Sequence, residues 1–348
     1  MRGEDCLFEI EEYPETVVEI IRILYFSGKL QTSGSLQEAL EKRGIEIETR
    51  TIRYHLTNLE KHSIVRRFGN RGVILTDLGI EEAKMLLVFD RVGGLAMETE
   101  RLSLECEYTP SAKCGTIMVN SLLVDEDKTE EALQVLLEAA KSRVIVSSRL
   151  GILRPGQRMW NYEIPQGKNA LIGVSSRNYD VLLQQMRVPT ETSATFLYCI
   201  EGGRPKGIAD IISHTGTTLS PGELLIRGKY TSVSDVVSRG SGLVTAAIKT
   251  FPSVFFDEVK KRLESLDTTL FSGLVELKAQ IPHSYRMSYK DRNRGYMIVY
   301  GGANFLAPLV ERNLAEKLSI SHGLYDVERM LPVEQRIESL RGREMLAD

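Results

Sequence analysis

The first domain is recognised from Thr49-Arg-Thr-Ile-Arg-Tyr-His-Leu-Thr-Asn-Leu-Glu-Lys61, followed after two residues by Ile64-Val-Arg-Arg-Phe-Gly-Asn-Arg-Gly-Val-Ile-Leu75. The first part predicts a helix, because Ile52, Leu56 and Leu59 recur on one helical face. The second part predicts a two-stranded hairpin around a glycine-containing turn. Amphipathic helices over about residues 14–27 and 35–43 precede it. Three helices and a hairpin predict a winged helix-turn-helix domain, to which we assign residues 1–92.

Positive charge gathers on this domain. The whole chain carries a formal net charge of −3, whereas residues 48–71 contain six Lys or Arg residues against two Glu residues. Arg and Asn are residue types that read guanine and adenine in the major groove, and arginines in a wing neutralise phosphates. We therefore predict DNA contacts from ten residues: Arg50, Thr51, Arg53, Tyr54, Thr57, Asn58, Arg66, Arg67, Asn70 and Arg71. The alternative is that these are solvated faces of a domain that binds another protein.

The remaining sequence alternates predicted strands and helices. Gly93-Gly94 breaks the preceding helical pattern and marks a domain boundary. We expect an α/β effector domain over residues 93–322 and an amphipathic helical tail over residues 323–348, so that the whole chain is of the α+β class. A shift of 126 residues lays Asn178 on Asn304 and superposes several predicted strands and helices. This predicts an internal strand-helix duplication with a ligand cleft between two lobes, against the alternative of chance agreement.

Composition limits the classes of function. The chain has 348 residues, of which 42% are hydrophobic and 26% charged, as in an ordinary soluble protein. The absence of a long apolar stretch and the acidic N-terminal residues predict a cytoplasmic protein without membrane contact. Four scattered cysteines without a C-x-x-C pair predict neither disulfides nor zinc. The five histidines lie singly and no nucleophile or phosphate-loop motif accompanies them, so we expect no enzyme activity, metal or cofactor.

A polar, glycine-rich segment over residues 201–242 carries the candidate effector site. Exposed backbone N–H groups, hydroxyls and guanidinium groups together can bind a small carboxylate. The candidate effector-binding residues are Arg204, His214, Thr215, Thr217, Thr218, Arg227, Arg239 and Ser241. Each arginine has an alternative role in an ion pair with Glu201, Asp210, Glu223 or Asp235, and the glycines have an alternative role in turns.

Four segments of the sequence resemble one known family. They are Gly202-Gly-Arg-Pro-Lys-Gly-Ile-Ala-Asp-Ile-Ile-Ser-His-Thr-Gly-Thr-Thr-Leu-Ser-Pro221, Ile226-Arg-Gly-Lys-Tyr-Thr-Ser-Val233, Arg239-Gly-Ser-Gly242 and Tyr300-Gly-Gly-Ala-Asn-Phe-Leu-Ala-Pro308. They resemble the regulatory domain of NrpR-type nitrogen regulatory repressors of methanogenic archaea, and with the winged helix the resemblance covers about residues 14–320. The chain departs from the family pattern at Ser175-Ser176-Arg177, where members are more apolar and carry a cysteine.

The resemblance implies a function. It implies a homodimeric repressor that binds palindromic operators of nitrogen-fixation and ammonia-assimilation operons and is released by the dicarboxylate 2-oxoglutarate. Some members carry two regulatory domains and this chain has room for one, so a second regulatory-domain protein is an expected partner. The alternative function is that of a co-repressor whose winged helix binds a partner regulator rather than DNA.

Overall fold

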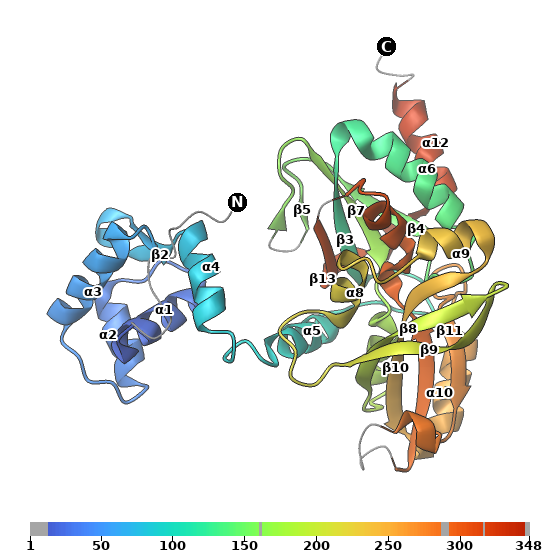
Figure 1. The fold of residues 1–348 in the computed structure, drawn as a ribbon, viewed down its shortest axis with the longest axis horizontal. Coiled ribbons are helices and arrows are strands. Elements are labelled where there is room, and N and C mark those ends of the chain that lie inside the picture. The colour runs from blue at the N-terminus through green and yellow to red at the C-terminus, as the bar shows by residue number, and fades with distance from the viewer. Residues whose placement is uncertain (1–12, 160–161, 287–291, 316, 345–348) are drawn as a thin grey trace. The chain divides into compact units, whose positions relative to one another are not determined.

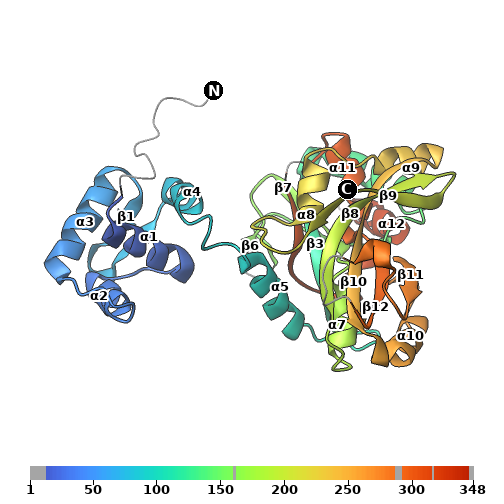
Figure 2. The same cartoon turned by 60° about the horizontal axis from the view of Figure 1, so that its bottom comes forward.

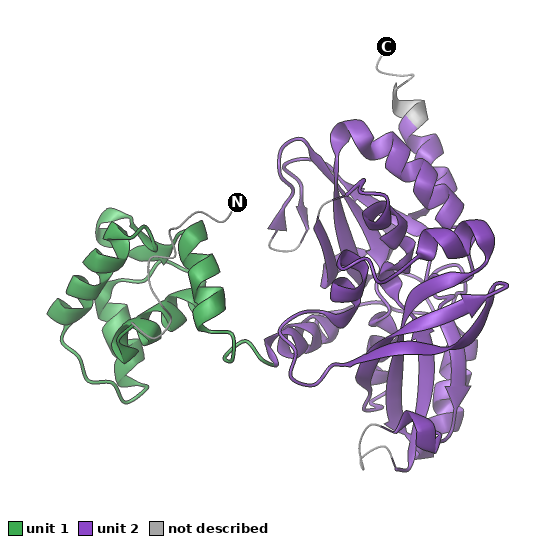
Figure 3. Cartoon of the chain, viewed as in Figure 1, with its two compact units in different colours: residues 1–92 green, residues 93–348 purple. Residues whose placement is uncertain are grey.

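A computed structural model of the chain describes residues 13–159, 162–286, 292–315 and 317–344. The chain divides into two compact units, residues 1–92 and residues 93–348, which Figure 3 shows in green and purple. Each unit has its own hydrophobic core, so the two are described separately. Across the described residues, no helix combines the length and apolarity that a bilayer crossing requires.

The first unit has the predicted winged-helix architecture (Figure 1). Its elements are α1 (Glu15–Ser27), α2 (Ser33–Glu41), α3 (Thr49–Lys61), β1 (Val65–Arg67), β2 (Val73–Leu75) and α4 (Asp77–Leu86). The apolar stripes meet in one core, where Ile20, Leu36 and Ile52 are fully buried. β1 and β2 pair antiparallel and form the wing.

Local sequence fixes the connections between these elements. α2 begins at a capping box in which Thr32 Oγ1 accepts a hydrogen bond from Ser35 N at 3.1 Å, and Ser35 Oγ accepts one from Thr32 N at 2.9 Å. At the base of the wing, Gly72 has φ +117°, and a Cβ there would lie 2.4 Å from Gln31 O. Only glycine allows this close approach of the wing to the strand-like residue Gln31, which bridges to Val73.

The second unit contains two five-stranded antiparallel sheets. Their orders are β13-β3-β7-β4-β14 and β11-β12-β10-β8-β9. The strands are β3 (Thr116–Asp125), β4 (Arg149–Leu153), β5 (Arg158–Met159), β6 (Tyr162–Glu163), β7 (Lys168–Val174), β8 (Glu191–Glu201), β9 (Arg204–Ser213), β10 (Gly242–Pro252), β11 (Leu274–Lys278), β12 (Arg294–Tyr300), β13 (Lys317–Asp326) and β14 (Leu331–Pro332). The helices are α5 (Gly94–Leu104), α6 (Thr129–Ala139), α7 (Asn178–Gln184), α8 (Pro221–Arg227), α9 (Val233–Arg239), α10 (Phe256–Glu264), α11 (Ala307–Glu311) and α12 (Val333–Glu344).

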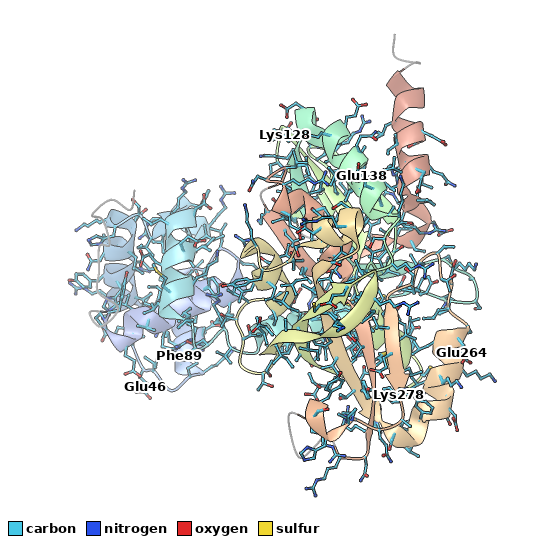
Figure 4. The ribbon with its side chains drawn as sticks, turned by 45° about the vertical axis from the view of Figure 1, so that its right-hand side comes forward. Glu46, Phe89, Lys128, Glu138, Glu264 and Lys278 are labelled. Carbon is cyan, nitrogen blue, oxygen red and sulfur yellow. The ribbon has the colours of Figure 1, made fainter. Side chains whose placement is uncertain are left out.

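Helices cover the sheets and bury their apolar stripes. α6 lies beside α12, and Leu136 of α6 and Ile337 of α12 belong to the same core cluster (Figure 1). The charged side chains of α6, such as Glu138, remain on its outer side (Figure 4). α10 packs against the β11–β12 part of the second sheet, where Val259 joins the core (Figure 2).

The structure shows the predicted duplication. Lys168–Val174 and Arg294–Tyr300, which form β7 and β12, lie 126 residues apart at both ends, and β3 and β10, α6 and α10, and β4 and β11 correspond in the same way. In each half an asparagine after the third strand secures the first strand. Asn178 binds Met118 N and O at 2.9 and 2.8 Å, whereas Asn304 binds Thr245 N and O at 3.1 and 2.9 Å.

The two halves exchange their last strands. β8 and β9 belong to the first half of the sequence but lie in the sheet of the second half, where β8 pairs with β10. β13 and β14 belong to the second half but pair with β3 and β4 of the first. Each five-stranded sheet therefore contains three strands of one half and two of the other. The halves cannot separate without breaking both sheets.

The boundary predicted at residue 323 needs correction. It falls inside β13, and the helix predicted for the tail begins only at Val333, after β14 has paired with β4. Val333 is fully buried, so this segment belongs to the domain core. The strand was missed because a register shift between Ser319 and Gly323 breaks its apolar alternation.

Candidate functional site

A cavity of about 310 Å³ lies within the second unit, where the two halves of the duplication meet. Its walls come from α5, the start of α7, β8, the loop after β9, β10 and the glycine turn Gly301-Gly302. This volume is at the lower end of the range for small-molecule sites. The cavity therefore has the size for a small metabolite.

Four polar side chains form one hydrogen-bonded cluster in this cavity. Lys249 Nζ lies 2.6 Å from Asp180 Oδ2 and 2.8 Å from Thr192 Oγ1. Thr192 Oγ1 also donates to Asp180 Oδ2 at 3.0 Å. Arg177 Nη1 reaches Thr192 Oγ1 at 3.1 Å but is 3.4 Å from Asp180 Oδ2. Two cations thus share one carboxylate, and the positive charge of Arg177 is the less compensated.

Local structure explains why these side chains converge. Arg177 lies three residues after the end of β7, at the N-cap of α7, and Asp180 lies in the first turn of that helix, so both are held at the end of the first sheet. Lys249 lies opposite Thr192 in the β10–β8 ladder, next to a register shift after Ile248. Such bulges redirect side chains beside functional sites. The cluster therefore joins the two sheets.

Burial and charge set the protonation of the ion pair. Burial is the larger influence on Lys249 and lowers its pKa to about 8, although Asp180 opposes the shift. Burial also acts to raise the pKa of Asp180, but the charges of Lys249 and Arg177 outweigh it and hold that pKa below its ordinary value. Both groups are therefore charged at neutral pH. Asp180 Oδ1, in contrast to Oδ2, is buried without a hydrogen-bond partner among the described residues.

His214 is neutral and fixed in one tautomer. Burial and the charges of Arg177 and Lys249 lower its pKa to about 3. Arg177 Nη2 can only donate, so His214 Nδ1 accepts this contact of 3.5 Å. The proton then lies on Nε2, which donates to Thr195 Oγ1 at 2.8 Å. The ring positions Arg177 without adding charge to the cavity.

The duplication provides an internal control for the cluster. At the positions 126 residues away, Arg177 corresponds to Ala303, Asp180 to Leu306, Thr192 to Leu318 and Lys249 to Leu123. Leu306 and Leu318 are buried in the core of the other half. The same fold thus forms with apolar residues at these positions, and buried ion pairs are seldom the more stable choice. The charged cluster is therefore not a requirement of the fold.

The structure separates the predicted effector residues into two groups. His214, Thr215 and Thr217 line the cavity, whereas Thr218 does not. The other four residues lie elsewhere: Arg204 at the β8–β9 turn, Ser241 beside Gly202, and Arg227 and Arg239 in exposed ion pairs with Glu223 and Asp235 at 2.9 and 2.6 Å. For Arg227 and Arg239 the structure thus forms the ion pairs that the sequence left as the alternative.

Sequence reasoning missed Arg177, Asp180, Thr192, Thr195 and Lys249. One signal was present, because Lys249 interrupts the apolar run of β10 and a lysine in a central strand requires a partner. The partner itself could not be identified from the sequence. It lies 69 residues away in the other half of the domain.

The predicted DNA-contacting residues are exposed on α3 and the wing of the first unit, and we call them together the α3–wing surface. Its members are Arg50, Thr51, Arg53, Tyr54, Thr57 and Asn58 on α3, and Arg66, Arg67, Asn70 and Arg71 at the wing; only Asn58 is partly covered. Arg67 pairs with Glu60 at 3.0 Å. Arg50, Arg66 and Arg71 form no ion pair with any described residue. These charges are available to phosphates.

Together, these features define a class of protein: a winged-helix protein with a separate, cavity-bearing domain. Comparison with protein families agrees with both parts. Residues 18–83 match the winged-helix domain of ribonuclease R. Residues 92–331 match the NrpR regulatory domains NRD1 and 2, and the chain belongs to this family.

Relatives extend the similarity over most of the chain. The global nitrogen regulator NrpRI of Methanosarcina mazei is 26% identical over 314 residues, which cover 90% of this chain and 96% of that protein. The global nitrogen regulator NrpR of Methanocaldococcus jannaschii is 26% identical over 301 residues, covering 85% of this chain but 51% of that protein. A crystal structure of a nitrogen repressor-like protein from Methanococcus jannaschii shares the fold, with a TM-score of 0.54 at 15% identity over 68% of this chain and 97% of that one.

Proposed function

We propose that the protein is a repressor of nitrogen-fixation and nitrogen-assimilation genes that binds a palindromic operator as a homodimer and is released by 2-oxoglutarate. The observation that carries the proposal is the Arg177–Lys249 cluster, which occupies the cavity although the duplicated half does without it. The relatives named as nitrogen regulators and the basic α3–wing surface support the same conclusion.

The cavity has the chemistry to bind a small dicarboxylate. Arg177 supplies a planar guanidinium that matches a carboxylate with two parallel hydrogen bonds. Lys249 supplies a second cation from the opposite sheet, and Thr195, Thr215 and Thr217 supply hydroxyls. Asp180 compensates the charge of Lys249 more closely than that of Arg177, so we assign the first carboxylate of 2-oxoglutarate to Arg177. This assignment replaces the surface arginines Arg227 and Arg239 as candidate ligands.

The α3–wing surface has the chemistry to bind duplex DNA. α3 presents Arg50, Arg53 and Asn58, which suit a helix in the major groove, and the wing presents arginines to the phosphates. In a two-fold dimer, two such helices fit half-sites that lie about 34–36 Å apart, or a multiple of that distance. A ligand that changes this separation releases the operator, since a coupling of about 1–3 kcal/mol changes affinity about 5- to 150-fold.

Three measurements on the full chain test the proposal. Calorimetry with 2-oxoglutarate and with glutamate tests the effector, and we expect heat with 2-oxoglutarate. Fluorescence anisotropy with labelled DNA selected from random sequences tests operator binding, and we expect Arg50→Ala plus Arg53→Ala to abolish it. Light scattering should give a dimer at micromolar concentration. If the parent chain does not bind DNA even at low ionic strength, the result favours the alternative function, a co-repressor whose winged helix binds a partner regulator.

A further inference from the structure

One helix of the second unit connects the cavity with the DNA-binding unit. α5 begins at Gly94, and the first unit ends at Val92. The residues of α5 that line the cavity are Leu95, Ala96, Thr99 and Glu100, which lie on one helical face by their spacing. The wall of the cavity is therefore also the first element after the winged helix.

α5 is weakly attached to the domain. Of its eleven residues only Thr99, Leu102 and Ser103 are buried, and Leu102 is the single large apolar side chain among them. Gly93 precedes the helix with φ +82°, and no atom lies within 4 Å of a Cβ built there. Elements with few buried apolar contacts move at low free energy, and a glycine leaves the backbone next to such an element freer than any other residue would.

α5 carries a negative charge that a bound anion would repel. Glu100 is exposed at the cavity-lining face of α5 and forms no ion pair with a described residue. Arg101, the neighbouring cation, is bound by Glu98 at 2.6 Å and also by Glu105. An anion held by Arg177 and Lys249 therefore faces a like charge on α5, and like charges in a shared cavity repel.

We propose that Glu100 is the residue through which an anionic ligand displaces α5, and through α5 the winged helix. The inference rests on the proposed function for the identity of the ligand. Because the repulsion exists only while the ligand is bound, Glu100 has no part in DNA binding itself. Glu100 weakens ligand binding in the DNA-bound conformation. The ligand therefore prefers the conformation in which α5 is displaced, and this difference in affinity releases the DNA.

A matched pair of variants tests the proposal in the full chain. Glu100→Gln and Glu191→Gln each neutralise one exposed acid that lines the cavity, but Glu191 lies on β8 and not on α5. We expect both variants to bind 2-oxoglutarate more tightly in calorimetry. We expect both to bind DNA as the parent does. Only Glu100→Gln should reduce, by at least about five-fold, the factor by which 2-oxoglutarate weakens DNA binding.

Hydrogen exchange gives a second readout that a purely structural role would not change. On adding 2-oxoglutarate, amides over residues 95–104 of the parent should exchange faster, and those of Glu100→Gln should change little. The inference is overturned if 2-oxoglutarate weakens DNA binding of Glu100→Gln by the same factor as in the parent, or if that factor falls equally in Glu100→Gln and Glu191→Gln. Either result leaves the proposed repressor function intact. A parent chain that gives no heat with 2-oxoglutarate overturns the effector and this inference together.

Discussion

Lys249 Nζ lies 2.6 Å from Asp180 Oδ2, and the two residues belong to different halves of a duplicated domain. The exposed fractions of their side chains are 1% and 5%. A buried ion pair therefore joins the sheets at the cavity, although the equivalent positions of the duplicate, Leu123 and Leu306, are apolar.

Removing one member of the Lys249–Asp180 ion pair should destabilise the fold more than replacing both members with leucine. Lys249→Met leaves the Asp180 carboxylate buried without its main partner, so we expect the second unit to lose about 3–5 kcal/mol of unfolding free energy. Lys249→Leu combined with Asp180→Leu reproduces the residues of the other half and should recover most of that loss. Urea unfolding measures both. A double variant as unstable as the single one would contradict the view that the cluster serves binding rather than folding.

His214 should make stability depend on pH between 6.5 and 3. Its pKa is lowered to about 3 by burial and by Arg177 and Lys249, so the unfolded chain binds a proton first as the pH falls. The stabilisation is present above pH 6.5 and is lost as the pH decreases towards the folded value. From pH 7 to pH 5 we expect a loss of about 2 kcal/mol. His214→Gln should remove that part of the slope in parallel urea titrations, and unchanged slopes would contradict the burial of a neutral ring.

Arg177, rather than the surface arginines, should determine effector affinity. Arg177→Gln removes the less compensated of the two cations of the cavity cluster, and we expect calorimetry to show about 10- to 100-fold weaker binding of 2-oxoglutarate, the range of a charge-assisted hydrogen bond. Arg239→Gln is the matched control, because Arg239 forms an exposed pair with Asp235. The reverse ranking of the two variants would move the effector site to the glycine-rich segment predicted from the sequence.

Arg50 should contribute one phosphate or base contact to DNA binding. Arg50→Ala should weaken binding, and if its contact is to a phosphate the slope of log affinity against log salt should fall by about 1. Lys84→Ala is the control, because Lys84 lies on α4 and pairs with Glu81 at 2.5 Å. Anisotropy titrations between low and physiological salt measure both. Equal effects of the two substitutions would show that the protein binds DNA without using the α3–wing surface.

Much of the fold could be predicted because its signals are local. The apolar stripe of α3, the Gly69–Gly72 turn and the repeated strand-helix order each lie within short windows of sequence. β13 was missed because a register shift hides its alternation, and α5 was missed because its apolar residues do not form one face. The cavity cluster could not be assembled from the sequence, although Lys249 in the apolar run of β10 gave one local signal. Its members become neighbours only after the two halves exchange strands, which no local pattern reveals.

The strand exchange also bears on how such a domain could arise. Either half expressed alone would leave the edge of its first strand, β3 or β10, without its partner strand, and the strand able to fill that edge would come from a second copy of the same half. A single half is therefore suited to an intertwined homodimer with the cavity on its two-fold axis. Once two copies are joined in one polypeptide, their sequences no longer have to be identical. One copy could then keep Ala303 and Leu306 at the positions where the other acquired Arg177 and Asp180. The pocket would thereby become asymmetric and able to distinguish the two ends of its ligand.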